Sequence, residues 1–373
     1  MEKVLQKERT TDETSRLSEN TGQETEVLFA PMVSDRPKKT VLLTAEEVDQ
    51  AAAIIRKGGL VAMPTETVYG LAADALNGQA VANIFRAKGR PMDNPLIVHI
   101  AAAEQIMPLV RYFPPKAQKL AEMFWPGPLT MILPKADIIP EEVSAGLDTV
   151  AVRCPANETA RRLIQLSAPL AAPSANLSGS PSPTTAAHVW QDMNGRIDAI
   201  LDGGDCQVGV ESTVVTLATE PPRLLRPGGV TLEQLREVLE DVVLDDAVLH
   251  PLAKGQQAAS PGMKYKHYAP KANVILLEGS EAAFLQYVNA HADDKTAVLC
   301  YEEEQTELSL PYLVLGKAAD YREQANRLFA LLRQADERGY TTLYAHCPPT
   351  EGVGLAVYNR IIRAAGFEVI SLA

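Results

Sequence analysis

The sequence is poor in cysteine and has no long apolar run. Its four cysteines, Cys154, Cys206, Cys300 and Cys347, are widely separated and form no CxxC pair. That spacing argues against a zinc site or a disulfide framework and favours reduced, structural thiols. The apolar runs, such as PLAAP and TVVTLA, are far below the roughly 20 residues that span a bilayer. The first residues also lack an apolar stretch of signal-peptide type, so we expect a cytoplasmic protein with no membrane partner.

Several familiar catalytic motifs are missing as well. The sequence contains no GxxxxGK[ST], GxGxxG, GxSxG or HExxH pattern. A P-loop, a dinucleotide-binding fingerprint, a hydrolase nucleophile elbow and a zinc-protease helix are therefore not indicated. The loops hold few acids, so no carboxylate pair for proton transfer stands out. The residues that are present suit positioning and charge neutralisation, as phosphoryl and nucleotidyl transfer require.

The charge of the chain is acidic overall and unevenly distributed. The formal net charge is -12, which argues against a protein that binds nucleic acid over its whole surface. However, no acid occurs between Asp246 and Glu278. That gap contains four lysines and two histidines, including Lys254, Lys264, Lys266, His267 and Lys271. A local basic segment thus interrupts an acidic protein.

The length predicts more than one domain, since 373 residues exceed the size at which a single core usually stops growing. Residues 1–38 are polar and aperiodic, and we expect a disordered or loosely ordered tail there. Strand and helix patterns alternate over 39–240, which predicts an α/β domain. Residues 241–272 lack periodicity and read as a linker. The alternation over 273–373 predicts a smaller α/β domain with a parallel sheet.

Capping signals locate several of these elements. Thr44 and Glu47 form a capping box before a helix, and Gly89 ends the helix at 79–88. In the first domain we expect strands at 60–64, 95–100, 129–134, 149–155, 169–176, 197–204, 212–218 and 222–227, and further helices at 114–125, 157–168, 184–193 and 232–240. In the second we expect strands at 273–279, 296–301, 311–316, 341–347 and 367–373, and helices near 280–292, 317–338 and 354–365.

Polar groups follow the predicted strands at points where open α/β sheets bind ligands. The stretch PTETVYGL carries hydroxyls at Thr65, Thr67 and Tyr69, although such a run taken alone is more often a capped turn. Lys88 and Arg90 stand two residues apart on a proline-stiffened loop and suit phosphate oxygens. The helix dipole also favours cations at that helix end, whatever the function.

Two more sets of polar residues suit an anion. The stretch APSANLSGSPSPT places Ser174, Asn176 and Ser182 on a loop after a strand, where side-chain and backbone donors can meet an anion. Arg153 and Arg226 lie in apolar strands and need anionic partners, because an unpaired buried charge is very costly. A ligand carboxylate or phosphate would serve, and so would a distant Asp or Glu.

These motifs, in this order, resemble a known family. PTETVYGL, KGRP with NPLIVH, VRCP, APSANLSG and ESTVV with LRPG resemble the YrdC-type domain of the threonylcarbamoyl-AMP synthase family. SPGMKYKHYAPKA and GLAVYNRIIRAA are similar to the long two-domain form. The resemblance implies a YrdC-like twisted mixed sheet with a concave basic cavity, plus a smaller Rossmann-like α/β domain at the C-terminus.

The resemblance also implies a reaction and its participants. The family is a group of nucleotidyltransferases that convert L-threonine, bicarbonate and ATP into threonylcarbamoyl-AMP and pyrophosphate. The product serves the t6A modification beside the anticodon of tRNA. Partner proteins accept the intermediate, so contact with tRNA would be indirect. Mg²⁺ should accompany ATP, but no residue is indicated as a metal ligand.

Site residues follow from matching the family's motifs onto this chain. The catalytic set implied is Lys88, Arg90, Ser174 and Asn176. The L-threonine set is Thr67, His99, Arg153, Ala172 and Ser212, and it changes His99 from a core residue to a ligand. The ATP set is Lys88, Arg90, Asn94, Thr149, Ser174, Asn176, Ser182, Arg226 and Tyr268. The linker 241–272 is expected to fold over the site as a lid, with Lys264, Lys266 and His267 facing phosphates.

Two other functions remain open at this level. The basic stretch at 254–271 could make the chain an RNA-binding YrdC-like protein, although four lysines are few for binding a phosphate backbone. The second alternative is a carbamoyl-adenylate or nucleotide-hydrolysing enzyme of the same fold.

Overall fold

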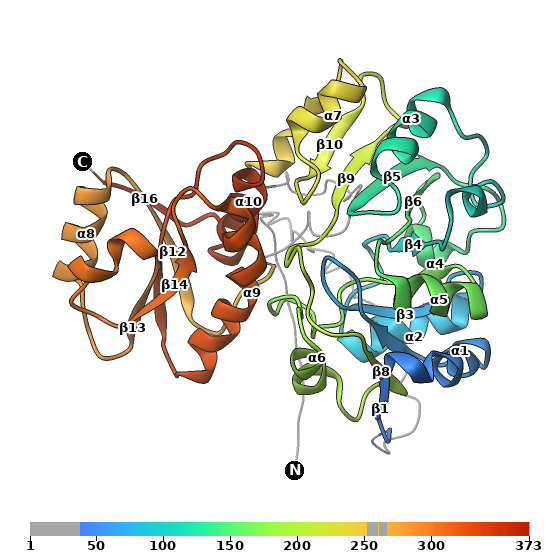
Figure 1. The fold of residues 1–373 in the computed structure, drawn as a ribbon, viewed down its shortest axis with the longest axis horizontal. Coiled ribbons are helices and arrows are strands. Elements are labelled where there is room, and N and C mark those ends of the chain that lie inside the picture. Colours follow the sequence, from blue (N-terminus) through green and yellow to red (C-terminus); the bar gives the residue numbers. More distant parts are fainter. Residues whose placement is uncertain (1–37, 252–259, 261–266, 373) are drawn as a thin grey trace, which may run out of the picture. The chain divides into compact units, whose positions relative to one another are not determined.

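The computed structural model describes residues 38–251, 260 and 267–372, and Figure 1 traces its elements. The predicted tail, apart from Lys38, lies outside the described residues, as do Lys254, Lys264 and Lys266. All four cysteines are free thiols, and Cys154, Cys206 and Cys300 are buried. In the part of the chain that is described, no helix is long and apolar enough to cross a bilayer.

The first domain is built on a mixed sheet of eleven strands in the order β1-β8-β2-β3-β7-β4-β6-β5-β9-β10-β11. These strands are β1 (Val41–Thr44), β2 (Val61–Met63), β3 (Gly70–Asp74), β4 (Ile97–His99), β5 (Leu129–Pro134), β6 (Thr149–Arg153), β7 (Leu170–Ala171), β8 (Ala199–Asp202), β9 (Thr213–Thr216), β10 (Arg223–Arg226) and β11 (Val243–Leu244). Parallel pairs such as β4–β6 alternate with antiparallel pairs such as β5–β6. The sheet is therefore mixed, as predicted.

The helices of the first domain are α1 (Val48–Arg56), α2 (Gly78–Lys88), α3 (Pro115–Phe124), α4 (Glu141–Ser144), α5 (Glu158–Leu166), α6 (Ala186–Met193) and α7 (Leu232–Val238), with short 3₁₀ turns η1 (Ala45–Glu47), η2 (Ala103–Ile106) and η3 (Asp246–Val248). Four of these helices, α2, α5, α6 and α7, begin at a residue whose side chain caps them. Gly89 ends α2 with φ of 62°, a left-handed conformation that glycine adopts without a Cβ clash. The loop from Lys88 to Arg90 is thereby turned back toward the sheet.

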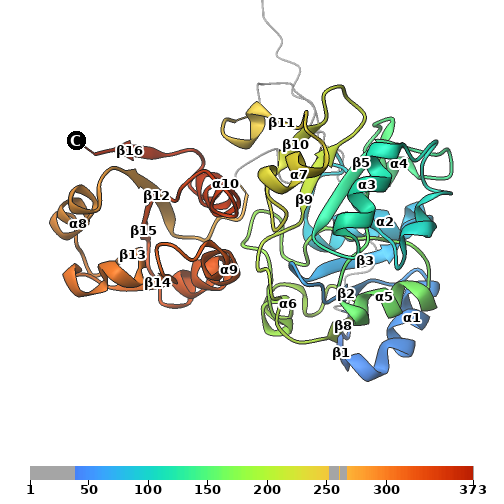
Figure 2. The same cartoon turned by 45° about the horizontal axis from the view of Figure 1, so that its top comes forward.

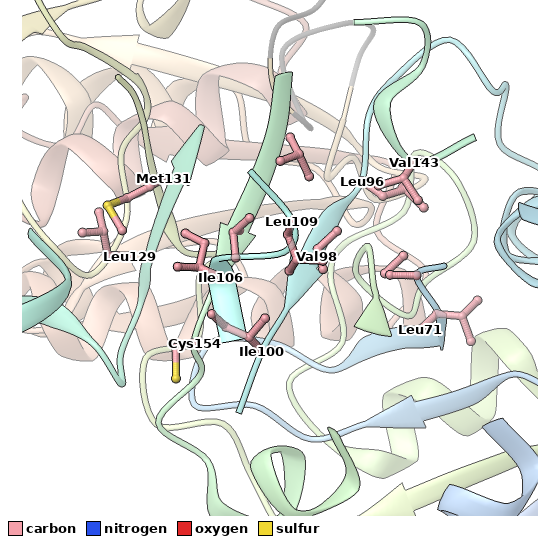
Figure 3. Packing of buried hydrophobic residues seen from close by; sticks show 14 of the residues in the cluster. Leu71, Leu96, Val98, Ile100, Ile106, Leu109, Leu129, Met131, Val143 and Cys154 are labelled. Carbon is pink, nitrogen blue, oxygen red and sulfur yellow. The ribbon is translucent and has the colours of Figure 1, made fainter. Parts of the chain in front are cut away.

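The main core of this domain lies between the sheet and its helices. Figure 3 shows Val98 and Ile100 from the β4 region packed near Ile106 and Leu109, with Cys154 close by. Each of these side chains is at most 2% exposed. The core thus fixes the strands whose ends carry the polar residues described below.

The second domain is a parallel sheet of five strands in the order β14-β13-β15-β12-β16. Its elements are β12 (Asn273–Glu278), α8 (Glu281–Ala290), β13 (Thr296–Tyr301), η4 (Glu302–Glu307), β14 (Tyr312–Gly316), α9 (Tyr321–Glu337), β15 (Thr342–His346), α10 (Gly354–Ala364) and β16 (Val369–Ser371). Helices α9 and α10 lie side by side, as Figures 1 and 2 both show. Both sheets belong to one compact unit.

The structure corrects some details of the predicted elements. The strand expected at 169–176 is only β7, two residues long, because Pro173 cannot donate to a ladder and Ser174 keeps a single bridge to Gly70. Strands β1, β3 and β11 were not predicted, and β11 belongs to the large sheet although it lies in the segment 241–272 that was predicted to be a linker. Strand β3 consists of Gly, Leu, Ala and Asp, residue types of which most have low strand propensity, so its burial rather than its composition makes it a strand.

Candidate active site

A polar cavity lies where several strands of the large sheet end. His99 and Arg153 are the last residues of β4 and β6 and are paired in register across that parallel ladder. The free volume of the cavity is about 40 Å³. It is lined by Thr65, Thr67, Val68, Gly70, Arg90, Ile97, His99, Arg153, Ala172, Pro173, Ser174, Glu211, Ser212, Arg226, His267 and Tyr268. The lining therefore combines cations and hydroxyls drawn from seven separate stretches of the first domain and from the segment before β12.

Arg153 is the central cation on one side of the cavity. Its Nη1 donates to Thr67 Oγ1 at 2.8 Å, and its Nη2 lies 2.7 Å from Glu66 Oε1. Both charged side chains are at most 9% exposed. The sequence left a ligand or a distant acid as the partner of Arg153, and the structure supplies the acid. Thr67 Oγ1 also lies 2.8 Å from Thr65 Oγ1, so this hydroxyl pair is held in place by Arg153.

His99 faces the same cavity as a neutral group. Its Nδ1 lies 3.1 Å from the carbonyl oxygen of Ile97, which favours a proton on Nδ1. Burial, and secondly the charge of Arg153, lower the pKa of His99 to about 3. The imidazole is therefore uncharged at neutral pH and can offer its other nitrogen to a polar ligand.

Arg226 and Ser212 form a second bonded pair in the cavity lining. Arg226 Nε donates to the carbonyl oxygen of Ser212 at 3.0 Å, and its Nη2 donates to Ser212 Oγ at 3.1 Å. The Ser212 hydroxyl also lies 2.8 Å from Thr130 Oγ1 of β5. Burial lowers the pKa of Arg226, yet a guanidinium stays charged at neutral pH. Two buried arginines, Arg153 and Arg226, therefore face one small cavity.

Lys88 braces the loop that follows β7. The Lys88 ammonium donates to the backbone carbonyls of Ser174 and Asn176, and the second of these distances is 2.6 Å. Asn176 Nδ2 in turn donates to the carbonyls of Leu177 and Ser180. Burial, and then the nearby Arg90, hold the pKa of Lys88 well below its ordinary value. Lys88 and Asn176 thus fix the shape of the loop while Ser174 lines the cavity.

Arg90 also lines the cavity. Its Nη2 lies 3.4 Å from the carbonyl oxygen of Asn94, and its guanidinium carbon lies 5.8 Å from the centre of the Phe85 ring. Burial lowers the pKa of Arg90 to about 10, so the group remains a cation at pH 7. The rigid loop therefore presents a charged fork to the cavity.

Glu211 and Tyr268 complete the lining. Glu211 accepts a hydrogen bond from Ser182 Oγ and forms an ion pair with Arg360 of the second domain, with Nε to Oε2 at 2.7 Å. Burial raises the pKa of Glu211, but Arg360 and Arg226 outweigh it and hold that pKa below its ordinary value. Tyr268 is 1% exposed and packs edge-on against His267, with ring centres 4.2 Å apart.

The structure thus brings together most of the residues expected from the sequence. All five residues of the L-threonine set line the cavity, together with Arg90, Ser174, Arg226 and Tyr268 of the ATP set. The others stand behind or away from it. Lys88, Asn94, Asn176 and Ser182 are buried next to lining residues, and Thr149 lies at the far end of β6 from Arg153. Their assignment to ATP stays a prediction.

Sequence reasoning missed Glu66, Glu211 and Arg360. Glu66 lies in the motif PTETVYGL and Glu211 in ESTVV. In both motifs the neighbouring residue, Thr67 or Ser212, was assigned to the site and the glutamate was not. Arg360 had a signal in the apolar helical stretch GLAVYNRIIRAA, where a charge on the buried face needs a partner. Its partner is 149 residues away in the chain, so the sequence alone did not identify it.

The cavity contains no ready-made metal site. Among the described residues, no group of three or more His, Cys, Asp or Glu side chains could hold a metal ion. The two oxygens of Glu211 are bound by Ser182 and Arg360. Protein groups here therefore fit a Mg²⁺ ion poorly, and any Mg²⁺ would depend on oxygens that a ligand brings.

Two family models together match most of the chain. The model described as telomere recombination, the Sua5, YciO and YrdC group, matches residues 53–228. The model described as the C-terminal domain of threonylcarbamoyl-AMP synthase matches residues 230–366. The matched segments correspond to the large mixed sheet and to the region that contains the parallel sheet.

Individual relatives match at high identity over nearly their whole length. The chain is 45% identical to threonylcarbamoyl-AMP synthase of Pyrococcus abyssi over 335 residues, which are 86% of this chain and 95% of the relative. It is 46% identical to the Bacillus subtilis enzyme of that name, over 87% of this chain and 94% of the relative. The crystal structure of P. abyssi Sua5 complexed with L-threonine matches with a TM-score of 0.81 and 43% identity, covering 90% of this chain and all of that one.

Fold and site together define an α/β nucleotidyltransferase with a cation-lined cavity. Among nucleotidyltransferases, the relatives that match at 45–46% identity over nearly their whole length are threonylcarbamoyl-AMP synthases. The chain belongs to the threonylcarbamoyl-AMP synthase family, in its long two-domain form. The predicted family, fold class, enzyme class and activity are therefore confirmed.

Proposed function

We propose that this cavity is where the chain converts L-threonine, bicarbonate and ATP into threonylcarbamoyl-AMP and pyrophosphate. The observation that carries the proposal is the grouping of Thr67, His99, Arg153, Ala172 and Ser212 around one cavity with Arg90, Ser174 and Arg226. Hydroxyls and a neutral imidazole suit the polar side of threonine, and buried arginines suit its carboxylate and the phosphates of ATP.

L-threonine binds on the side of Arg153 and Thr67. The Arg153 guanidinium is the donor for the threonine carboxylate, and its ion pair with Glu66 holds it in place. Ser212 and the neutral His99 offer partners for the amino and hydroxyl groups. The Thr65–Thr67 hydroxyl pair, which Arg153 holds in place, shapes the subsite.

ATP binds on the side of Arg90, Ser174 and Arg226. Arg90 and Arg226 neutralise the phosphates, while the loop braced by Lys88 presents Ser174. Tyr268 and His267 cover this side, because both line the cavity from the segment that precedes β12. The free volume of about 40 Å³ is far below the roughly 300–1,000 Å³ of sites for drug-sized ligands. ATP entry therefore requires the segment with His267 and Tyr268 to move, in keeping with a lid.

Catalysis follows from positioning without a covalent enzyme intermediate. The threonine amine attacks the carbon derived from bicarbonate, and water leaves to give a carbamate. A carbamate oxygen then attacks the α-phosphorus of ATP, and pyrophosphate departs. Holding the reactants in line and balancing the charge on the leaving phosphates supplies the acceleration. Mg²⁺ bound to the phosphates would add charge neutralisation when present.

The product is passed to other proteins, which transfer the threonylcarbamoyl group to tRNA for the t6A modification. The acidic net charge of -12 supports an indirect contact with tRNA.

The test is a purified enzyme supplied with ATP, bicarbonate and one amino acid at a time. Pyrophosphate and the adenylate should form with threonine in clear preference to serine or alanine. Arg90→Ala should lower the rate on the order of 100-fold, as expected when a group that stabilises developing charge is removed. Equal product with alanine would contradict the specificity, and near-wild-type pyrophosphate release by Arg90→Ala would contradict the role of Arg90.

A further inference from the structure

Arg360 of α10 is the largest fully buried side chain among the described residues, and it belongs to the second domain. Its hydrogen bonds reach the first domain. Nε donates to Glu211 Oε2 at 2.7 Å, and Nη2 lies 3.3 Å from the Glu211 carbonyl oxygen and 3.0 Å from that of Pro227. Its guanidinium carbon also lies 5.3 Å from the centre of the Tyr268 ring. One side chain thus contacts three points around the cavity.

Those points are next to the groups that the reaction uses. Glu211 precedes Ser212 and Pro227 follows Arg226, and Ser212 and Arg226 are themselves bonded to each other. The backbone of the 211–212 segment is therefore held by two arginines at consecutive carbonyls. Arg226 binds the carbonyl of Ser212 from inside the cavity, and Arg360 binds that of Glu211 from the second domain.

A second arginine of the same domain, Arg333, also contacts the first domain, behind the cavity lining. Arg333 of α9 forms a buried ion pair with Asp192 at 2.7 Å, and its Nη2 also donates to the carbonyl oxygen of Pro181 at 2.6 Å. Pro181 precedes Ser182, whose hydroxyl is bound to Glu211. Arg333 and Arg360 thus bind the two ends of one short linkage, in which Pro181 precedes Ser182 in the chain and Ser182 is hydrogen-bonded to Glu211.

We propose that Arg360 is a positioning residue for catalysis, through which the second domain holds Glu211, Pro227 and Tyr268 in the geometry that Ser212 and Arg226 need. The inference rests on the proposed function and adds a task for the second domain. Arg360 touches no reactant. It acts by fixing the backbone next to Ser212 and Arg226, which contact threonine and the phosphates. A small displacement of such contacts lowers the rate considerably.

The planar guanidinium of Arg360 is essential to this role because it donates to the Glu211 carboxylate and to two backbone carbonyls at once. A lysine at that position keeps the charge for Glu211 but has no planar set of donors for the two carbonyls. Arg360→Lys should therefore lose positioning while it keeps the neutralisation of Glu211. Arg360→Met removes both and retains most of the side-chain volume.

The experiment compares wild type, Arg360→Lys, Arg360→Met, Glu211→Gln and the Arg360→Met/Glu211→Gln double variant in the full chain. Gln324→Leu is the matched control, because Gln324 is 0% exposed and its hydrogen bonds go to Lys317 and Ala318 within the second domain. Pyrophosphate release is measured against threonine and against ATP, per mole of folded enzyme. The thermal shift that threonine alone produces is a second readout, independent of turnover.

Arg360→Lys should lower kcat/KM at least tenfold, raise the KM for threonine and reduce the threonine-dependent thermal shift. Glu211→Gln should add little to Arg360→Met, because both act on one linkage. Gln324→Leu should change the melting temperature with kcat/KM within twofold of wild type.

The proposal is overturned if folded Arg360→Lys keeps kcat/KM and KM within twofold of wild type. It is also overturned if the losses of kcat/KM in Arg360→Met and Glu211→Gln multiply independently in the double variant. If Arg360→Met does not fold, Arg360→Lys and Glu211→Gln decide by the same criteria. A wild-type enzyme without threonine-dependent turnover contradicts the proposed function itself, whereas an active wild type with an equally active Arg360→Lys contradicts only the role of Arg360.

Discussion

Lys88 Nζ lies 2.6 Å from the backbone carbonyl oxygen of Asn176 and also donates to that of Ser174. The lysine of the KGRP motif is thus bound to the protein's own loop, while Arg90 two residues later is the one that lines the cavity. The two cations of the motif have separate tasks, since one shapes the loop and the other faces the ligand.

Replacing Lys88 by Met should therefore abolish the loop geometry along with activity. Two buried carbonyls lose their donor, each at a cost of about 1–3 kcal/mol. We expect kcat/KM to fall at least 100-fold, measured by pyrophosphate release. Lys135→Met is the matched control, because Lys135 is also buried but binds Glu141 and Ser144 outside the cavity. That control should lower only the melting temperature, and equal kinetic losses in both variants would contradict the assignment.

Thr67→Val tests the threonine side of the cavity with little change in shape. Thr67 is 0% exposed, and its hydroxyl accepts from Arg153 Nη1. Loss of that acceptor leaves a buried donor unpaired, at a cost of about 1–3 kcal/mol in stability, and frees Arg153 to shift away from the threonine carboxylate. A loss of the same size in the transition state is equivalent to roughly 5–150-fold in kcat/KM for threonine. Steady-state kinetics should show this loss, with less effect on the KM for ATP. Thr216→Val in β9 removes a buried hydroxyl away from the cavity and should keep wild-type kinetics.

His99 should make the protein less stable in acid. Its pKa is about 3 in the folded chain and about 6.5 in the unfolded chain, so the unfolded state takes up the proton first as pH falls. Stability from neutral His99 is complete above pH 6.5 and is lost progressively toward pH 3. Between pH 7 and pH 5 the loss is at most about 2 kcal/mol.

Denaturant titrations at these two pH values measure that loss directly. His99→Gln has no proton to take up, so its free energy of unfolding should fall less between pH 7 and pH 5 than that of wild type. Parallel pH profiles for the two proteins would show that His99 does not titrate in this way.

Gly209 marks a close approach between the two domains. It has φ of 80°, and a Cβ built there would lie 2.3 Å from Asn326 Cα and 2.6 Å from the Ala325 carbonyl oxygen, both in α9. Gly204 has φ of 82° with nothing within 4 Å of such a Cβ. Gly204→Ala should cost about 1–2 kcal/mol from backbone strain alone. Gly209→Ala should cost several kcal/mol more, because backbone atoms of α9 must move.

Thermal unfolding of the two glycine variants measures the difference. We expect a distinctly lower midpoint for Gly209→Ala, accompanied by faster proteolysis between the domains. Equal midpoints would mean that α9 accommodates the methyl group.

The parts of the fold that were predictable are those whose signals are local. The Thr44–Glu47 capping box and the Gly89 end of α2 were readable because caps act within a few residues. The strand β3 was missed because tertiary burial, and not composition, makes it a strand. At the site, the apolar strands around Arg153 and Arg226 identified these two arginines, whereas Ser212 was assigned only through the family resemblance. The Glu66 partner of Arg153 depends on how the chain folds back, 87 residues away in sequence, and no local pattern encodes it.

Because Arg333 and Arg360 bind the first domain, substitutions in the core of the second domain should lower activity as well as stability. Phe329 of α9 is fully buried, and its ring centre lies 5.3 Å from that of Tyr268. A conservative change such as Phe329→Leu lies outside every substrate contact. It nevertheless loosens the helix pair that carries the two arginines. We expect such a variant to lose activity before its loss of stability is noticed. Distance to the substrate is therefore a poor criterion for separating catalytic from structural positions in this protein.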